Sequence, residues 1–267
     1  MAPYSKNGFL GEDVKVWIDD NRQHYLELFM LAEQFNSICY ESLREVSLSN
    51  KDNKKHIISC LFLRIMEHFQ GTYVLVTRGM VSSANVMLRA LIEAMFVLVS
   101  ISKDDDALKA YVLNDELERL KLANKIIEDK DEVYSEADKK SAKQIKSEIQ
   151  DTLKEIKYLR YRTEDFARIA GLHNWYTTVY AFISRSVHAT IKDMEQHLDL
   201  DECYNVKSIK LIPNDNGTLN ILTTACNALN ISLQSFLTVL EKNTDVCTIN
   251  DAKLKPYLEE ALKIHVE

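Results

Sequence analysis

Proline and glycine are scarce along this chain. Only 3 prolines and 6 glycines occur in 267 residues, and no proline lies between Pro3 and Pro213. Proline interrupts helices because it lacks a backbone N–H and clashes with the preceding turn. A chain rich in Leu, Ala, Glu and Lys is therefore free to form long helices over this stretch. The sequence predicts an all-α protein.

Closely spaced cysteines are missing as well. The 5 cysteines are odd in number and scattered, and they form no CxxC pair that binds zinc or exchanges disulfides. We interpret them as buried reduced thiols, including Cys60, which lies in the apolar segment SCLFLRIMEHF. The N-terminal segment MAPYSKNGFLGEDVKVW has no basic region followed by an apolar stretch and a cleavage site, which argues against secretion. We expect a cytoplasmic protein that uses no metal and no cofactor.

Long apolar runs and an excess of positive charge are also lacking. The longest apolar stretch, Val86 to Ile101, is interrupted by Arg89 and Glu93 and is shorter than the roughly 20 residues that span a bilayer. We therefore expect no membrane anchor. The net charge of -7 argues against nonspecific binding of duplex DNA through a basic surface, although a local basic pocket can still bind a phosphate.

Apolar residues recur every three or four positions along most of the chain, which is the period of an amphipathic helix. With 46% hydrophobic residues, a single helical domain covering residues 1–267 can bury a sizeable core. The third predicted helix is apolar on nearly every side and is expected to lie at the centre of a multi-helix bundle. The predicted helices cover approximately residues 12–46, 56–80, 83–100, 107–128, 136–159, 164–170, 175–197, 218–240 and 251–264.

Two segments are expected to depart from the bundle. Residues of about 105–160 contain two charged helices whose apolar stripes match, which predicts a long antiparallel helical hairpin. Such an arm either binds a protein partner or is simply a solvated pair of helices. Farther along, alternating apolar residues are followed by Pro213 and an Asp-Asn-Gly turn, which predicts at most one short β-hairpin near residues 204–220.

The predicted central helix carries polar residues on one face. In the segment SSANVMLRALIEAMFVLVSIS, Asn85, Arg89 and Glu93 follow one another at intervals of four residues. Burying an ion costs on the order of several kcal/mol unless the ion is paired and hydrogen-bonded. Arg89 and Glu93 are therefore either an internal ion pair or part of a site in which Arg89 holds a phosphate or carboxylate and Glu93 orients it.

A second polar face occurs in the segment WYTTVYAFISRSVHATIKD. Tyr180, Ser184 and His188 lie at successive i,i+4 positions of the predicted helix. A histidine can act as a general acid or base near neutral pH, and a serine one turn away can orient it or a substrate oxygen. The alternative is that His188 is an ordinary, hydrogen-bonded histidine without a chemical role.

Common catalytic motifs do not occur. The sequence has no GxxxxGKS phosphate-binding loop, no GxGxxG, no HExxH, no GxSxG and no ExxH pair. A P-loop nucleotide hydrolase, a zinc protease, an α/β-hydrolase and a di-iron bundle are therefore not expected.

Three segments carry a resemblance to a known family. They are LRALIEA in the central helix, YVLNDELERLKLA after it, and the run from EDFARIAGL to SRSVHA. With them, residues of about 71–190 resemble an uncharacterised family of bacterial all-helical proteins, a domain of unknown function that is placed near the HEPN superfamily.

HEPN domains are helical bundles, and many are metal-independent ribonucleases of toxin–antitoxin or anti-phage systems with an Arg-x4-6-His motif. The resemblance implies a homodimer that binds RNA or a nucleotide. The sequence departs from the motif, because Arg185 and His188 are only three residues apart. Arg168 and His173 have the spacing, but Gly171 between them indicates a helix end, so we interpret this match as chance.

The leading hypothesis is an HEPN-like RNA-cleaving or nucleotide-binding protein. In this mechanism a ribose 2′-hydroxyl attacks the adjacent phosphate, His188 transfers the proton, and Arg89 stabilises charge on the phosphoryl oxygens without a metal. The alternative is a noncatalytic interaction protein in which the same residues form a structural polar network. The catalytic candidates are Arg89, Glu93, Ser184 and His188, and the binding candidates are Tyr180, Arg185, Asn85, Tyr111 and Arg119.

Overall fold

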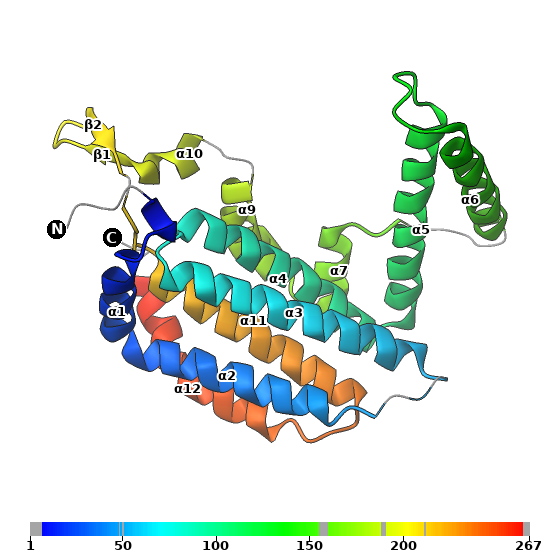
Figure 1. Ribbon diagram of the computed structural model, residues 1–267. Coiled ribbons are helices and arrows are strands. Elements are labelled where there is room, and N and C mark those ends of the chain that lie inside the picture. Colours follow the sequence, from blue (N-terminus) through cyan, green and yellow to red (C-terminus); the bar gives the residue numbers. More distant parts are fainter. Residues whose placement is uncertain are drawn as a thin grey trace.

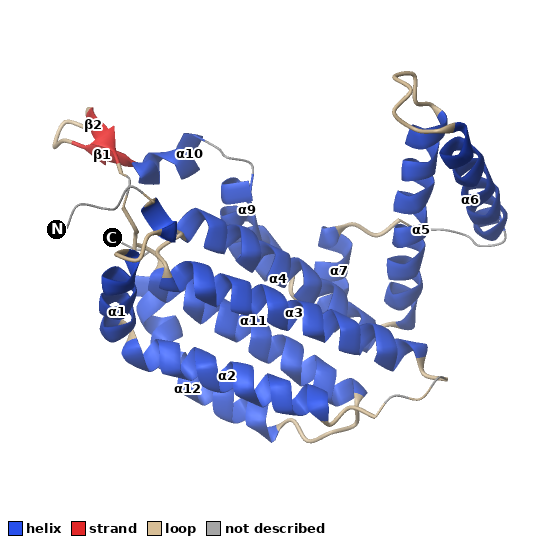
Figure 2. Cartoon of the chain, in the orientation of Figure 1, coloured by secondary structure: helices blue, strands red, loops and turns tan. Residues whose placement is uncertain are grey.

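Five long helices build the body of the protein and lie side by side (Figures 1 and 2). The computed structural model describes residues 7–47, 49, 51–154, 160–187, 191–210 and 212–263. It confirms the predicted all-α bundle with one short β-hairpin. The five helices are α2 (Leu26–Arg44), α3 (Asn53–Thr77), α4 (Val81–Lys103), α11 (Thr218–Val239) and α12 (Asp245–Lys263).

The core lies where α4 and α11 pack against α3. Phe62 of α3 and Phe236 of α11 stack with their ring centroids 4.3 Å apart. Full burial of such side chains contributes about 1.5–3 kcal/mol each. By length and composition α4 is apolar enough to cross a membrane, but 61% of its most apolar window is buried inside the bundle. The prediction that this helix is central is therefore confirmed.

A tight turn joins α3 to α4, the two helices that carry most of the residues discussed below. Gly79 in this turn has a φ of +71°. A Cβ atom at Gly79 would lie 2.5 Å from Cβ of Pro213 and 2.7 Å from the ring of Trp17. Only glycine fits both this backbone conformation and this close approach.

The predicted first helix, residues 12–46, is in fact two helices. The 3-10 turn η1 (Gly8–Leu10) is followed by α1 (Val14–His24), and the backbone leaves helical geometry at Tyr25, with φ -111° and ψ 33°. The break lets α1 turn onto α3, where the buried side chain of Asn21 donates a hydrogen bond to the carbonyl of Val76 at 3.2 Å. The spacing of hydrophobic residues continues through Tyr25, so the sequence does not indicate that the helix breaks there.

The charged arm is present as predicted and projects from one end of the bundle (Figure 1). It consists of α5 (Asp105–Ile127) and α6 (Glu136–Lys154), which bury Ala123, Ala142 and Ile149 between them. At its base the Asp104 side chain accepts the backbone N–H of Asp106 at 2.8 Å, which caps α5. A 2.7 Å ion pair between Lys54 and Asp105 ties α5 to α3.

The predicted helix over residues 175–197 is divided into several segments. Residues 188–190, which include His188, lie outside the described residues. Before it, α7 (Thr163–Ala170) ends at Gly171, whose φ of +74° confirms the predicted left-handed cap. The segments that follow are α8 (His173–Trp175), the π-helix η2 (Tyr176–Tyr180), α9 (Ala181–Val187), α10 (Ile191–Met194) and the 3-10 turn η3 (Glu195–His197).

The β-hairpin is confirmed, but it begins earlier than predicted. Its strands are β1 (Leu198–Leu200) and β2 (Val206–Ile209), which pair antiparallel. The turn is organised by Asp201, whose carboxylate accepts the backbone N–H groups of Cys203 and Asn205, both at 2.8 Å. The Asp-Asn-Gly segment instead leads into α11, so β2 pairs with the strand before it rather than one after it.

Two of the cysteines are not buried. Cys39, Cys226 and Cys247 are buried as predicted, but Cys60 and Cys203 are exposed. Cys60 lies on α3 where this helix faces a hollow beside α5 rather than the core. The prediction of a buried Cys60 was wrong. The apolar residues around Cys60 suggested burial, but the arm leaves this side of α3 uncovered, and the local sequence does not indicate this.

A polar cluster fastens α1 and α2 to α3. The hydroxyl of Tyr73 donates to Glu33 and accepts from Arg22, and Arg22 and Glu33 form a 2.7 Å ion pair. The Arg22 guanidinium also lies over the ring of Phe29, 5.5 Å from its centroid. Three helices therefore meet at one phenol.

We predict that Tyr73→Phe lowers the free energy of unfolding by about 1 kcal/mol, because the hydroxyl is hydrogen-bonded to a charged group at a partly exposed place. Burial and Glu33 raise the pKa of Tyr73 from 10.0 to about 12. The stabilisation is therefore complete below pH 10 and is lost as pH rises toward 12. Urea unfolding near neutral pH and between these values measures both effects.

The matched control is Tyr134→Phe, a change in the exposed loop at the tip of the arm, which should leave unfolding unchanged. Equal stability of wild type and Tyr73→Phe near neutral pH would contradict the role assigned to this cluster.

Candidate functional site

Three of the predicted site residues meet between α4 and η2. Arg89 donates from Nη2 to the hydroxyl of Tyr180 at 2.8 Å, and this hydroxyl donates to Oε1 of Glu93 at 2.5 Å. Arg89 and Glu93 also form the ion pair expected one helical turn apart, with 3.0 Å between Nη2 and Oε1. The guanidinium lies over the Tyr180 ring, 5.1 Å from its centroid. The three side chains form a closed triangle.

The π-helix η2 aligns this triangle with a column of rings. The ring centroids of Tyr176 and Tyr180 are 5.2 Å apart and nearly parallel, and those of His173 and Tyr176 are 6.1 Å apart. Phe96 of α4 meets Tyr180 edge to face. A π-turn adds one residue to a helical turn and is common at functional sites. Here it stands where Tyr180 reaches across to α4.

Burial and charge both act on the triangle. The pKa of Tyr180 is raised, first by burial and then by its hydrogen bond to Glu93, against the opposing effect of Arg89. Burial lowers the pKa of Arg89, but Tyr180 and Glu93 outweigh it, so this pKa is raised. Tyr180 therefore stays a neutral donor and Arg89 stays charged. The Nε atom of Arg89 is buried and has no hydrogen-bond partner among the described residues.

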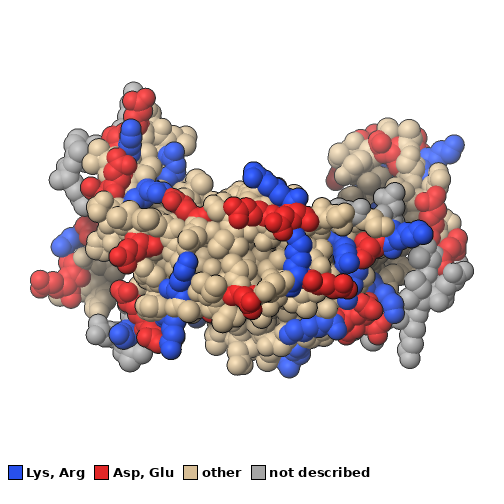
Figure 3. All heavy atoms as spheres, turned by 90° about the horizontal axis from the view of Figure 1, so that it is seen from below, with Lys and Arg blue, Asp and Glu red and all other residues tan. Residues whose placement is uncertain are grey.

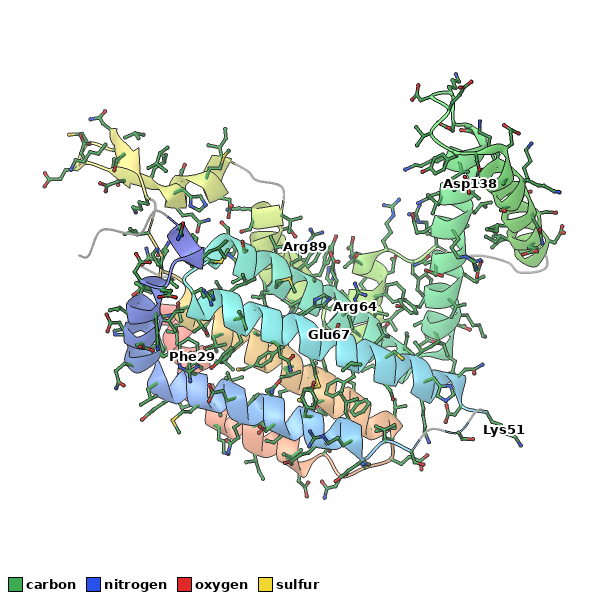
Figure 4. All side chains as sticks on the ribbon, viewed as in Figure 1. Phe29, Lys51, Arg64, Glu67, Arg89 and Asp138 are labelled. Carbon is green, nitrogen blue, oxygen red and sulfur yellow. The ribbon has the colours of Figure 1, made fainter. Side chains whose placement is uncertain are left out.

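The side chains of Arg89 and Glu93 are less buried than the sequence suggested. They are 21% and 40% exposed, respectively. Glu93 is the more open because it lines a cleft between α3, α4, α5 and the start of α7. Figure 4 shows Arg64 on α3 and Arg89 on α4, two neighbouring helices. The arm begins at the end of α4, and α7 packs against α4 (Figure 1).

The cleft has a volume of about 860 Å³ and gathers titratable side chains from four segments. The charged groups on its walls are of both signs. They are Arg64 and His68 from α3, Glu93 from α4, Asp115, Glu116 and Glu118 from α5, and Arg160 and Arg162 from the segment before α7. Rings of Tyr111, Tyr161 and Phe166 complete the lining.

Several of these charges already have partners. Glu116 pairs with Arg119 at 2.7 Å, and Glu118 pairs with Arg160 at 3.3 Å. Four other groups form no side-chain hydrogen bond or ion pair with a described residue. They are the carboxylate of Asp115, the Oε2 atom of Glu93, and the guanidinium groups of Arg64 and Arg162.

Among the described residues, His68 is the one histidine on the wall of this cleft. Its pKa is lowered by burial and by the nearby charge of Arg64, while Glu67 and Glu93 act in the opposite direction. A neutral imidazole at physiological pH is able to accept a proton. Tyr111, which lines the same cleft, has a raised pKa, mainly because of burial, and remains a hydrogen-bond donor.

Among the described residues, the other predicted site residues form no hydrogen bond with the side chains of Arg89, Tyr180 or Glu93. The hydroxyl of Ser184 donates to the carbonyl of Tyr180 at 2.6 Å, which is a local bond within its own helix. The exposed Arg185 lies over the ring of Phe182, and Asn85 is half-buried one turn before Arg89. Arg119 is engaged by Glu116. His188 lies outside the described residues.

Sequence reasoning missed Arg64 and His68. They lie four residues apart in LFLRIMEHF and therefore share a helical face. That spacing was visible, but the segment is mostly apolar and was interpreted only as core. The sequence around Arg162 does not indicate that this residue lines the cleft, because its position depends on how the chain returns from the arm to the bundle.

The part of the chain that contains the cleft matches a known protein family. The model of a family of unknown function (DUF5677) matches residues 55–205, which is more than half of the chain. The chain belongs to the DUF5677 family. No curated protein and no solved structure matches the chain. Every residue that lines the cleft falls within the DUF5677 region, whereas α1, α2, α11 and α12 lie outside it.

The residues of the cleft do not form a metal site among the described residues. Among the residues that the structure describes, inside the DUF5677 region and outside it, no three or more His, Cys, Asp or Glu side chains are arranged to hold a metal ion. The donors in the cleft are instead interleaved with arginines, which suits an organic ligand that carries both charge and hydrogen-bond donors.

We predict that the pKa of His68 moves in opposite directions when its two neighbours are changed. Arg64→Met removes a positive charge and should raise this pKa, while Glu93→Gln removes a negative charge and should lower it further. The pH titration of the histidine C–H resonances by NMR measures both shifts. Lys255→Met, which removes a charge from the exposed side of α12, is the control and should leave His68 unchanged. Shifts of the same sign in both cleft variants would contradict the arrangement.

Proposed function

We propose that this DUF5677 protein is an HEPN-like protein that binds a nucleotide, or one nucleotide unit of an RNA, in the cleft and cleaves RNA there. The observation that carries the proposal is that one cleft gathers Arg64, His68 and Glu93 together with Asp115 and Arg162. The side chains of Asp115 and Arg162 form no hydrogen bond or ion pair with another described residue. Arginine suits phosphate because its planar fork matches the phosphate oxygens.

The size and lining of the cleft support a ligand of this class. Sites for small molecules have volumes of about 300–1,000 Å³, and this cleft has about 860 Å³. Tyr111 and Tyr161 offer rings for a base, and stacking of this kind contributes about 1–3 kcal/mol per base. A mononucleotide meets both conditions.

Charge on the surface also favours a local site. Figure 3 shows lysine and arginine side chains interspersed with aspartate and glutamate on the face that it presents, without an extended basic area. A protein that binds a long nucleic acid needs many contacts between Lys or Arg side chains and phosphates. A single nucleotide needs few, and Arg64 and Arg162 supply them.

The proposed reaction follows from the groups present. Neutral His68 accepts the proton of a ribose 2′-hydroxyl, the oxygen attacks the adjacent phosphorus, and the P–O5′ bond breaks to leave a 2′,3′-cyclic phosphate. Arg64 stabilises the charge that develops on the phosphoryl oxygens. The proton that the leaving oxygen needs comes from an acid such as His188 or Tyr111. This scheme shifts the base from His188, the first candidate, to His68.

We predict that purified protein cleaves mixed RNA in the presence of EDTA and that His68→Asn or Arg64→Met lowers the rate about 100-fold or more. The matched controls are His24→Asn and Arg44→Met, exposed residues of α1 and α2 that do not line the cleft. His188→Asn is measured in parallel. If it alone abolishes cleavage, His188 rather than His68 is the acid or base.

A noncatalytic role is the second candidate, and one observation favours it. The triangle of Arg89, Tyr180 and Glu93 satisfies most of its own donors and acceptors, as a structural network does. Absence of cleavage and of nucleotide binding would leave a helical interaction protein, with the arm as the contact for a protein partner. The homodimer that the resemblance implies belongs to both candidates and is tested by light scattering.

A further inference from the structure

Two carboxylates on the walls of the cleft have at least one oxygen without a hydrogen-bond or ion-pair partner among the described residues. Of the four carboxylate side chains on its walls, Glu116 and Glu118 are paired with Arg119 and Arg160. Asp115 forms no side-chain hydrogen bond or ion pair with a described residue. Glu93 uses only Oε1 for Arg89 and Tyr180. A ligand in the cleft therefore meets acceptors from both α4 and α5.

Glu93 is held in place before any ligand arrives. Its Oε1 atom accepts the Tyr180 hydroxyl at 2.5 Å and lies 3.0 Å from Nη2 of Arg89. Both donors act on the same oxygen, and Oε2 has no hydrogen-bond partner among the described residues. Glu93 lines the cleft and its side chain is 40% exposed, so a ligand there can donate to Oε2. An acceptor fixed in this way loses little side-chain entropy when it binds.

From this placement we infer that the nucleotide recognised by the cleft is a guanine nucleotide. Glu93 and Asp115 accept the N1–H and the 2-amino group of the base, while Arg64 and Arg162 hold the phosphate. The inference rests on the proposed function, because it names the base of the nucleotide proposed there.

The chemistry of the bases explains the choice. Guanine alone presents two adjacent donors, N1–H and the 2-amino group, on its Watson–Crick edge. Adenine and cytosine place a ring nitrogen acceptor beside their amino group, and uracil places its one donor between two carbonyls. A carboxylate facing such an acceptor is repelled by it and gains no hydrogen bond from the base in return for the water that it loses.

Arg89 and Tyr180 act as positioning residues in this scheme. They are not among the residues that line the cleft, yet both contact Oε1 of Glu93, which does line it. This assigns a use to the triangle that does not require Arg89 to touch the phosphate.

The test is isothermal titration of the full chain with 5′-GMP, IMP and AMP. We expect GMP to bind at least about 10-fold more tightly than AMP, and IMP, which lacks the 2-amino group, to fall between them. Glu93→Gln and Asp115→Asn should each reduce the preference for GMP over AMP about 10-fold. Glu116→Gln is the matched control, since this carboxylate also lines the cleft but is already paired, and it should keep the preference.

Tyr180→Phe separates positioning from stability. If Tyr180 only holds the fold, affinities for GMP and AMP fall together. If it positions Glu93, the ratio of the two affinities falls while binding of AMP is retained.

The outcomes distinguish the inference from the function beneath it. If no nucleotide binds to folded protein, the proposed function fails and the inference with it. Binding of nucleotides without a preference for GMP, or a preference that survives both carboxylate variants, overturns the inference and leaves the proposed function standing.

Discussion

Helix α4 has to satisfy neighbours on nearly all of its sides, and the rest of the structure follows from that constraint. It packs on α3, α11, α7 and α9, and it carries Arg89 and Glu93 where it meets Tyr180. A charged pair at such a place is costly unless hydrogen bonds from outside the helix complete it. Tyr180 supplies them, and the π-helix is the local departure that accompanies its placement.

The same combination of side chains occurs twice in the molecule with different surroundings. Arg22, Tyr73 and Glu33 join α1, α2 and α3, and Arg89, Tyr180 and Glu93 join α4 to η2. In each, a phenol stands between a guanidinium and a carboxylate. The first cluster faces solvent, where it can only fasten helices. The second includes Glu93, which lines a cleft and has one oxygen, Oε2, without a partner among the described residues. The two clusters contain the same side chains, and only the position of the second, beside a cleft, makes it a candidate functional site.

Much of the fold could be predicted because helix period and scarcity of proline are local properties. The long central helix, the arm and the cap at Gly171 are all confirmed. The break at Tyr25 and the strand β1 could not be predicted, because the first is set by packing of α1 on α3 and the second by which neighbour β2 finds. Only part of the triangle could be predicted. The spacing of Arg89 and Glu93 indicates that they share a helical face, but Tyr180 is 87 residues from Glu93 in the sequence, so its contact with them has no local pattern.

The cleft itself was invisible in the sequence for a related reason. Its walls come from α3, α4, α5 and the segment after α6, and they face one another only because the arm leaves the bundle at the end of α4. That departure uncovers α3 between Cys60 and His68, a stretch whose apolar residues suggested full burial. Polar side chains within an apolar helix are therefore most informative where a neighbouring helix turns away, since no packing partner is present there to explain them.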